Sequence, residues 1–96
     1  MNTAKQQIQE FKNEGFPFVY EWEDAPNTIY DEHFHKGKTA LYTIDGDIEF
    51  EYTDTNEVHI LKKGDLIYPE LKRPHKAKVG PHGWRVVVAE MIDGDS

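Results

Sequence analysis

The chain contains no cysteine and no long uninterrupted apolar run. The first absence excludes disulfides and thiolate metal ligands, and the second excludes a membrane-spanning helix. Positive charge is also scarce, since 11 Lys and Arg stand against 18 Asp and Glu for a net charge of −7. The first ten residues lack the basic and then apolar layout of a signal peptide. We therefore expect a cytoplasmic protein with neither a nucleic-acid nor a membrane partner.

The 96 residues are enough for one domain, residues 1–96, and too few for two hydrophobic cores. Ala4, Ile8 and Phe11 recur at helical spacing, and Gly15 follows as a stop signal. This pattern predicts one short amphipathic helix over about residues 3–14.

After the helix the apolar period changes to two, which indicates β-strands. Turn signals such as Asp45-Gly46 and Gly80-Pro81-His82-Gly83 separate the candidates. The first expected strand begins at Phe18. The later ones cover residues 30–35, 39–44, 47–53, 58–61, 66–68, 75–79 and 84–92. Such spacing predicts an all-β barrel or sandwich over about residues 16–92, and we expect the tail, residues 93–96, to fray.

His33 and His35 are the first candidates for chemistry. Two residues apart on a strand, they point to the same face with Cα atoms about 6.6 Å apart. Both imidazoles can then reach one ion at about 2.0–2.1 Å. The alternative is a pair of surface histidines that binds nothing.

Two longer stretches resemble the motifs of the cupin superfamily. HFHKGKTALYTIDG is similar to the first motif, with two histidines around one residue and a later glycine, and GDLIYPELKRPH resembles the second. The resemblance extends over nearly the whole chain and is to very small single-domain bacterial cupins. It implies an RmlC-like cupin jelly-roll β-barrel in which His33, His35 and His75 bind a divalent transition metal (Fe, Mn, Ni, Co, Cu or Zn).

The glutamate usual in the first cupin motif falls on Thr39, whose hydroxyl is a poor ligand for a divalent ion. Three neutral imidazoles leave the ion its full charge of +2, so its open positions should favour a small organic anion. Asp31, one pleat before His33, is an alternative carboxylate donor.

Further residues are expected to line the pocket beside the metal. They are Thr39, Leu41, Thr43, Phe50, Tyr52 and Tyr68. Ala40, Tyr42 and Ile44 form an apolar face on the other side of the same strand. We expect the N-terminal helix or a second subunit to cover that face, the latter giving a homodimer.

Three functions stay open at this point. The first is a metal-binding cupin that binds a small organic anion. The second is a mononuclear metal-dependent enzyme, for which the resemblance implies dioxygenase or isomerase chemistry. The third is a metal-free cupin that binds a small molecule. Because Thr39 replaces the expected carboxylate, the sequence offers few acids or bases, which favours the first function over the second.

Overall fold

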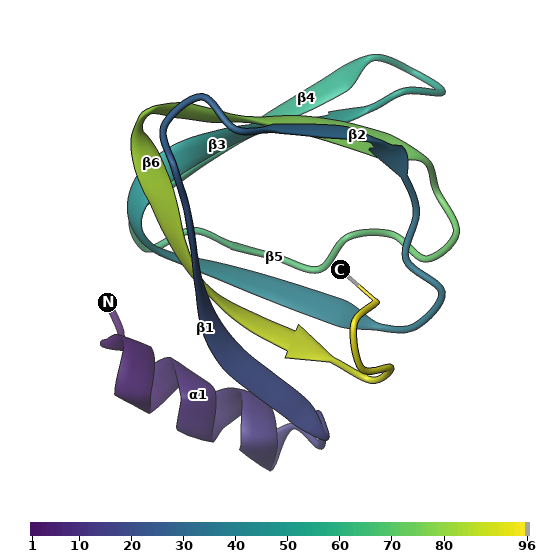
Figure 1. The fold of residues 1–96 in the computed structure, drawn as a ribbon. Helices are drawn as coiled ribbons and strands as arrows, with labels where there is room; N and C mark the ends of the chain where they lie inside the picture. The colour runs from purple at the N-terminus through teal and green to yellow at the C-terminus, as the bar shows by residue number, and fades with distance from the viewer. Residues whose placement is uncertain (96) are drawn as a thin grey trace.

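The computed structural model describes residues 1–95, and these form one helix and six strands (Figure 1). The elements are α1 (Ala4–Asn13), β1 (Phe18–Asp24), β2 (Ile29–His33), β3 (Thr39–Tyr52), β4 (Glu57–Lys62), β5 (Leu66–Ile67) and β6 (His75–Glu90). The predicted all-β class with a short N-terminal helix is confirmed. Across residues 1–95 no helix is long and apolar enough to cross a membrane.

Helix α1 begins and ends within one residue of the bounds that its sequence predicts. The Thr3 side chain accepts a hydrogen bond from the backbone N–H of Gln6, and the Gln6 side chain accepts one from the N–H of Thr3. This reciprocal cap satisfies two of the N–H groups left open at a helix start. Gly15 follows with a φ of 100°, a conformation that ends the helix readily only at glycine.

The prediction of turns at Asp45-Gly46 and at Gly80–Gly83 is wrong. Both segments lie inside long strands, β3 and β6, which bend there instead of reversing. The pairing register shifts on both sides of Gly46, as at a β-bulge. Gly46 has a φ of 73°, and a Cβ on it would lie 1.9 Å from the carbonyl oxygen of Gly83. Glycine is therefore needed at Gly46 for the close approach of two paired strands, not for a hairpin.

The two bent strands organise the whole fold. The sheet runs β1-β6-β3-β4, while β2 pairs with β6 and β5 pairs with β3. The first half of β3 and the second half of β6 lie with β1 and β5, and the other halves lie with β2 and β4. The strands thus curl around one interior (Figure 1). Within residues 1–95 no pairing joins β1 to β4, so the sheet is not closed.

Two hydrophobic clusters lie on opposite sides of the second half of β6. The inner cluster fills the interior and consists of Leu41, Ile48, Leu61, Ala77, Val79, Trp84, Val86 and Val88. The helix-side cluster lies beneath α1 and consists of Phe11, Phe16, Ala40, Tyr42, Val87 and Ala89. The apolar face that the sequence left uncovered is therefore covered by the helix, one of the two covers expected.

Candidate metal centre

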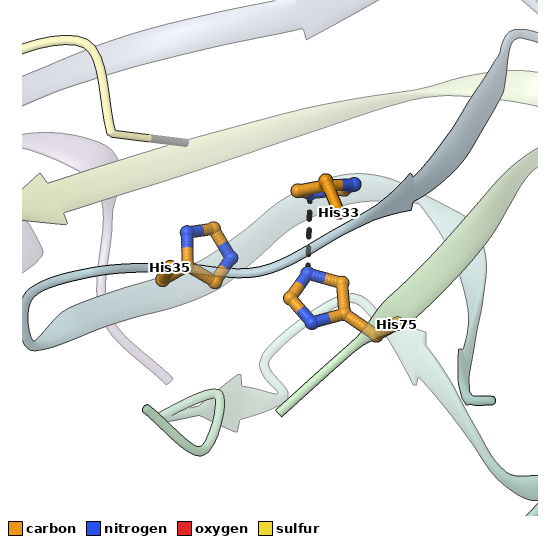
Figure 2. A group of neighbouring side chains, drawn as sticks. All are labelled: His33, His35 and His75. Atoms are coloured by element: carbon orange, nitrogen blue, oxygen red, sulfur yellow. Dashed lines mark hydrogen bonds between the residues drawn. The ribbon is translucent and has the colours of Figure 1, made fainter. Parts of the chain in front are cut away.

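Three histidines from two strand ends and one loop meet at one end of the interior (Figure 2). His33 is the last residue of β2, His35 lies in the loop after it, and His75 is the first residue of β6. The register places His33 opposite His75, with ring centroids 4.4 Å apart. One ligand atom from each of the three residues lies within 4.8 Å of the other two.

The backbone fixes which ring nitrogen of each histidine can bind a metal. Nδ1 of His33 lies 2.7 Å from the carbonyl oxygen of Asp31, Nδ1 of His35 3.1 Å from that of Asp95, and Nδ1 of His75 3.2 Å from that of Arg73. A carbonyl oxygen only accepts hydrogen bonds, so each Nδ1 carries a proton and donates it. In the neutral rings, each Nε2 is then left with a lone pair.

The free nitrogens converge at a spacing that suits a metal. Nε2 of His33 and Nε2 of His75 are 3.2 Å apart, as the dashed line in Figure 2 marks. Two lone pairs at that distance repel each other unless a proton or a metal ion lies between them. Nitrogens bound at about 2.1 Å around a tetrahedral ion are about 3.4 Å apart. The donor set therefore fits a divalent transition metal.

Burial favours the neutral form of two of these imidazoles. The pKa of His75 falls from 6.5 to about 4, chiefly because the ring is buried and also because His33 and His35 lie beside it. Burial lowers the pKa of His35 as well, against the opposing effect of Asp95 and Glu90. At neutral pH, protons therefore compete weakly with a metal for these two ligands.

Aromatic packing holds the central ring in place. The imidazole of His75 stacks on Phe50 at 4.3 Å and on His35 at 4.7 Å between centroids. Tyr52 meets the same ring edge-on at 6.2 Å. A ring packed in this way loses little freedom when it binds an ion.

A cavity of about 180 Å³ opens beside the histidines between the two layers of strands. It is lined by Tyr20, Trp22, Tyr30, His33, His35, Leu41, Ile48, Phe50, His75, Ala77, Trp84, Val86 and Val88. This lining contains neither a carboxylate nor a lysine or arginine. The Tyr30 hydroxyl donates to Asp24 at 2.6 Å, and burial and that carboxylate raise its pKa to about 12.

Leu41 and Phe50 are the two predicted pocket residues that lie in this lining. The prediction needs correction at the other four, because their side chains have partners elsewhere. The hydroxyl of Thr39 donates to the carbonyl of Gly37, and that of Thr43 accepts from the Trp84 indole N–H. The hydroxyl of Tyr52 accepts from the Glu70 backbone N–H, behind the ring of His75.

Tyr68 is the fourth correction. It follows the last residue of β5, so the alternation of a strand no longer decides where it points. The residue is 41% exposed, and its hydroxyl donates to Glu14 just after α1.

The carboxylate of Asp31 is not part of the histidine cluster, contrary to the alternative that the sequence left open. The register shifts between Tyr30 and His33, so the simple alternation from Asp31 to His33 fails. Asp31 contributes its backbone carbonyl instead, as the partner of His33 Nδ1. His59 lies outside the cluster and pairs with Glu57.

Sequence reasoning missed the C-terminal contribution to the site. The carboxylate of Asp95 accepts hydrogen bonds from the backbone N–H groups of Lys36 and Gly37, both at 3.0 Å. The segment expected to fray is thus attached to the loop that carries His35 as far as residue 95, and Ser96 lies outside the described residues. No local pattern could have revealed this contact. Trp84, Val86 and Val88 were missed as lining residues too, although their alternation in β6 could have indicated a shared face.

No protein-family model and no curated protein matches the sequence. Solved structures do match. The polyketide cyclase RemF from Streptomyces resistomycificus is 26% identical with a TM-score of 0.66, over 77% of this chain and 54% of the cyclase. A conserved protein with a double-stranded β-helix domain from Klebsiella pneumoniae is 24% identical with a TM-score of 0.66, over 81% of this chain and 69% of that one. An RmlC-like cupin from Shewanella frigidimarina is 15% identical with a TM-score of 0.67, over 81% of this chain and 68% of that one.

Proposed function

The chain is a small cupin by fold, and from that premise we propose that it binds a divalent transition metal through His33, His35 and His75. We propose further that the open positions of the metal bind a small organic anion, held in the adjoining cavity. Which of Fe, Mn, Ni, Co, Cu and Zn is bound depends on which of these metals is available in the cell.

One observation carries the proposal. All three Nδ1 atoms donate to backbone carbonyls, so all three Nε2 lone pairs are left for one ion. In a metal-free pocket the 3.2 Å approach of His33 to His75 requires a proton on one of the two Nε2 atoms, and the low pKa of His75 disfavours a proton on that ring. A metal ion between the two nitrogens removes the need for this proton.

The cavity supports the second half of the proposal. A cavity of about 180 Å³ is comparable to the apolar cavity of about 150 Å³ that holds one benzene molecule. Its walls carry no charged side chain, so the ion would supply the attraction for a negatively charged group. The ligand we expect is therefore small, with an anionic end toward the histidines and an apolar body among Leu41, Phe50 and Trp84.

Metal analysis of protein purified without an affinity tag tests the proposal directly. We expect close to one equivalent of metal per chain, and less than about a tenth of an equivalent after His75→Ala or His33→Ala. The matched control is His59→Ala, which removes a histidine from outside the cluster. Equal metal content in His75→Ala and His59→Ala would contradict the assignment. His33 is only half-buried, so its variant separates loss of a ligand from loss of folding.

A metal-dependent enzyme is the second candidate, and the similarity to a polyketide cyclase favours it. The resemblance stated from the sequence points instead to dioxygenase or isomerase chemistry. In either case the ion would act as a Lewis acid or redox centre. The cavity offers few groups to move a proton, since Tyr30 has a pKa of about 12 and its lining holds no carboxylate. Oxygen consumption by the Fe²⁺-loaded protein with small diketones tests for a dioxygenase.

Other expectations from the sequence stay predictions: a cytoplasmic location, a homodimer and the absence of a nucleic-acid or membrane partner. The homodimer has lost one of its arguments, because α1 already covers the face of Ala40 and Tyr42. Light scattering at several protein concentrations would measure the oligomeric state.

A further inference from the structure

Two aromatic side chains line the cavity where β1 and β2 run apart from the loop that joins them (Figure 1). Both strands pair with β6, and within residues 1–95 no backbone pairing joins them to each other. Trp22 lies on β1 and Tyr30 on β2. Side chains, rather than a backbone ladder, therefore form this part of the cavity wall.

One buried carboxylate fixes both rings. The indole N–H of Trp22 donates to Oδ1 of Asp24 at 2.8 Å, and the hydroxyl of Tyr30 donates to Oδ2 at 2.6 Å. Asp24 itself is only 8% exposed. Because each carboxylate oxygen holds one ring in place, the two rings lose little conformational freedom when a ligand packs against them.

Trp22 leaves much of its surface uncovered. The register places it opposite Val86, which also lines the cavity, so the indole faces the interior. Even so, 52% of the residue is exposed. An indole fixed beside a cavity is a binding surface that the protein itself does not fill, since tryptophan buries a large apolar area and packs well against other rings.

The rings of this lining offer their faces rather than their polar atoms. The indole N–H of Trp84 donates to the hydroxyl of Thr43 at 2.9 Å, so its polar atom is engaged within the protein, as are those of the two rings bound to Asp24. The ring centroid of Tyr30 lies 6.3 Å from that of His33. The aromatic wall therefore begins next to the metal centre.

We propose that the anion bound at the metal is an aromatic carboxylate, whose ring packs against Trp22 and Tyr30. This inference rests on the proposed binding of a metal and an anion, and it adds the chemical class of the ligand. The carboxylate binds at an open position of the ion, and the ring covers the exposed indole. Packing of one aromatic ring against another adds attraction that an aliphatic body of the same area lacks.

Three carboxylates added to the Co²⁺-loaded protein test the class of the ligand: acetate, cyclohexanecarboxylate and benzoate. The visible spectrum of Co²⁺ measures the binding of each. Acetate reaches only the ion, so benzoate should bind about tenfold to a hundredfold more tightly, because its ring is buried as well. Benzoate should also bind about threefold to tenfold more tightly than cyclohexanecarboxylate, which has a similar apolar area and no aromatic ring.

Trp22→Leu separates the aromatic wall from the metal. The variant should bind benzoate about threefold to tenfold more weakly, with unchanged affinity for acetate and for Co²⁺. Trp22→Phe keeps a ring and should retain most of the benzoate affinity. Phe18→Leu is the matched control, since Phe18 is an exposed aromatic residue of the same strand outside the cavity lining, and it should bind benzoate as the parent chain does.

Equal affinities of the parent chain for benzoate and cyclohexanecarboxylate would refute the aromatic class while the metal site stands. Benzoate binding that is unchanged in Trp22→Leu would refute it too. If Co²⁺ binds and none of the three carboxylates does, the proposed anion binding fails, and the aromatic class fails with it. If the parent chain binds no Co²⁺, the proposed metal site itself fails.

Discussion

Strand β6 has two unlike faces. Val87 and Ala89 lie in the helix-side cluster, where Phe11 and Phe16 of the N-terminal segment contact them and every member is apolar or aromatic. Val86 and Val88, on the other face, border a cavity that ends in three imidazoles. The comparison teaches that one strand can contribute to a packed core on one face and border a cavity on the other, since the first face is filled by the chain itself and the second is left open.

Truncation of a buried side chain in the helix-side cluster should produce the largest change in the free energy of unfolding. Phe11 is 0% exposed, and Phe11→Ala should lower the free energy of unfolding by about 3–5 kcal/mol. That is a large part of the roughly 5–14 kcal/mol expected for a chain of this size. Urea denaturation measures the change, and the folded fraction should keep its full metal content.

The matched control for this variant is Ile60→Ala on β4, where the side chain is 57% exposed. Its free energy of unfolding should change by less than about 1 kcal/mol. Loss of metal from folded Phe11→Ala protein would show that the two faces of β6 are coupled.

Acid should destabilise the metal-free protein through His75, which lies at the cavity and not in the helix-side cluster. The pKa of His75 is about 4 in the folded protein and 6.5 as its ordinary value, so between these pH values the unfolded chain binds a proton that the folded chain does not. Stability therefore falls as pH drops from about 6.5 to 4, by roughly 3 kcal/mol in total from this group, and no further below that window.

Urea denaturation of metal-free protein at a series of pH values measures this loss. His75→Phe removes the titrating group and should flatten that part of the profile, whereas His59→Ala should leave it unchanged. An identical pH dependence in the parent chain and in His75→Phe would refute the assignment to His75.

A smaller effect should come from the tail that is attached to the loop of His35. Asp95→Ala removes the carboxylate that binds the N–H groups of Lys36 and Gly37. The carbonyl of Asp95 then loses its fixed position against His35 Nδ1, and Co²⁺ affinity should fall about tenfold.

Asp93→Ala is the matched control for this variant, since Asp93 is an exposed acidic residue of the same segment. The melting temperatures of both variants should stay close to that of the parent chain. Equal Co²⁺ affinities in the two variants would show that the tail does not position His35.

Local patterns were enough to predict α1 and most strands. The spacing of Ala4, Ile8 and Phe11 describes a helix within one residue of its observed ends, because capping and amphipathicity act over a few neighbouring residues. The same local reasoning failed at Gly46 and Gly83. A glycine with positive φ serves a hairpin turn or a bulge equally well, and the partner strand alone distinguishes them.

The sequence by itself determined the three candidate nitrogen donors, since the two stretches that resemble cupin motifs contain His33, His35 and His75 and the chain has no thiol to compete with them. Tertiary structure alone decided how they meet: the distance from His35 to His75 in sequence is bridged by the pairing of β2 with β6. It also decided that Asp95 rather than a strand neighbour holds His35. The physical reason is that side-chain chemistry is a local property, whereas the charges and carbonyls around a site come from whatever segments the packing of the sheet brings beside it.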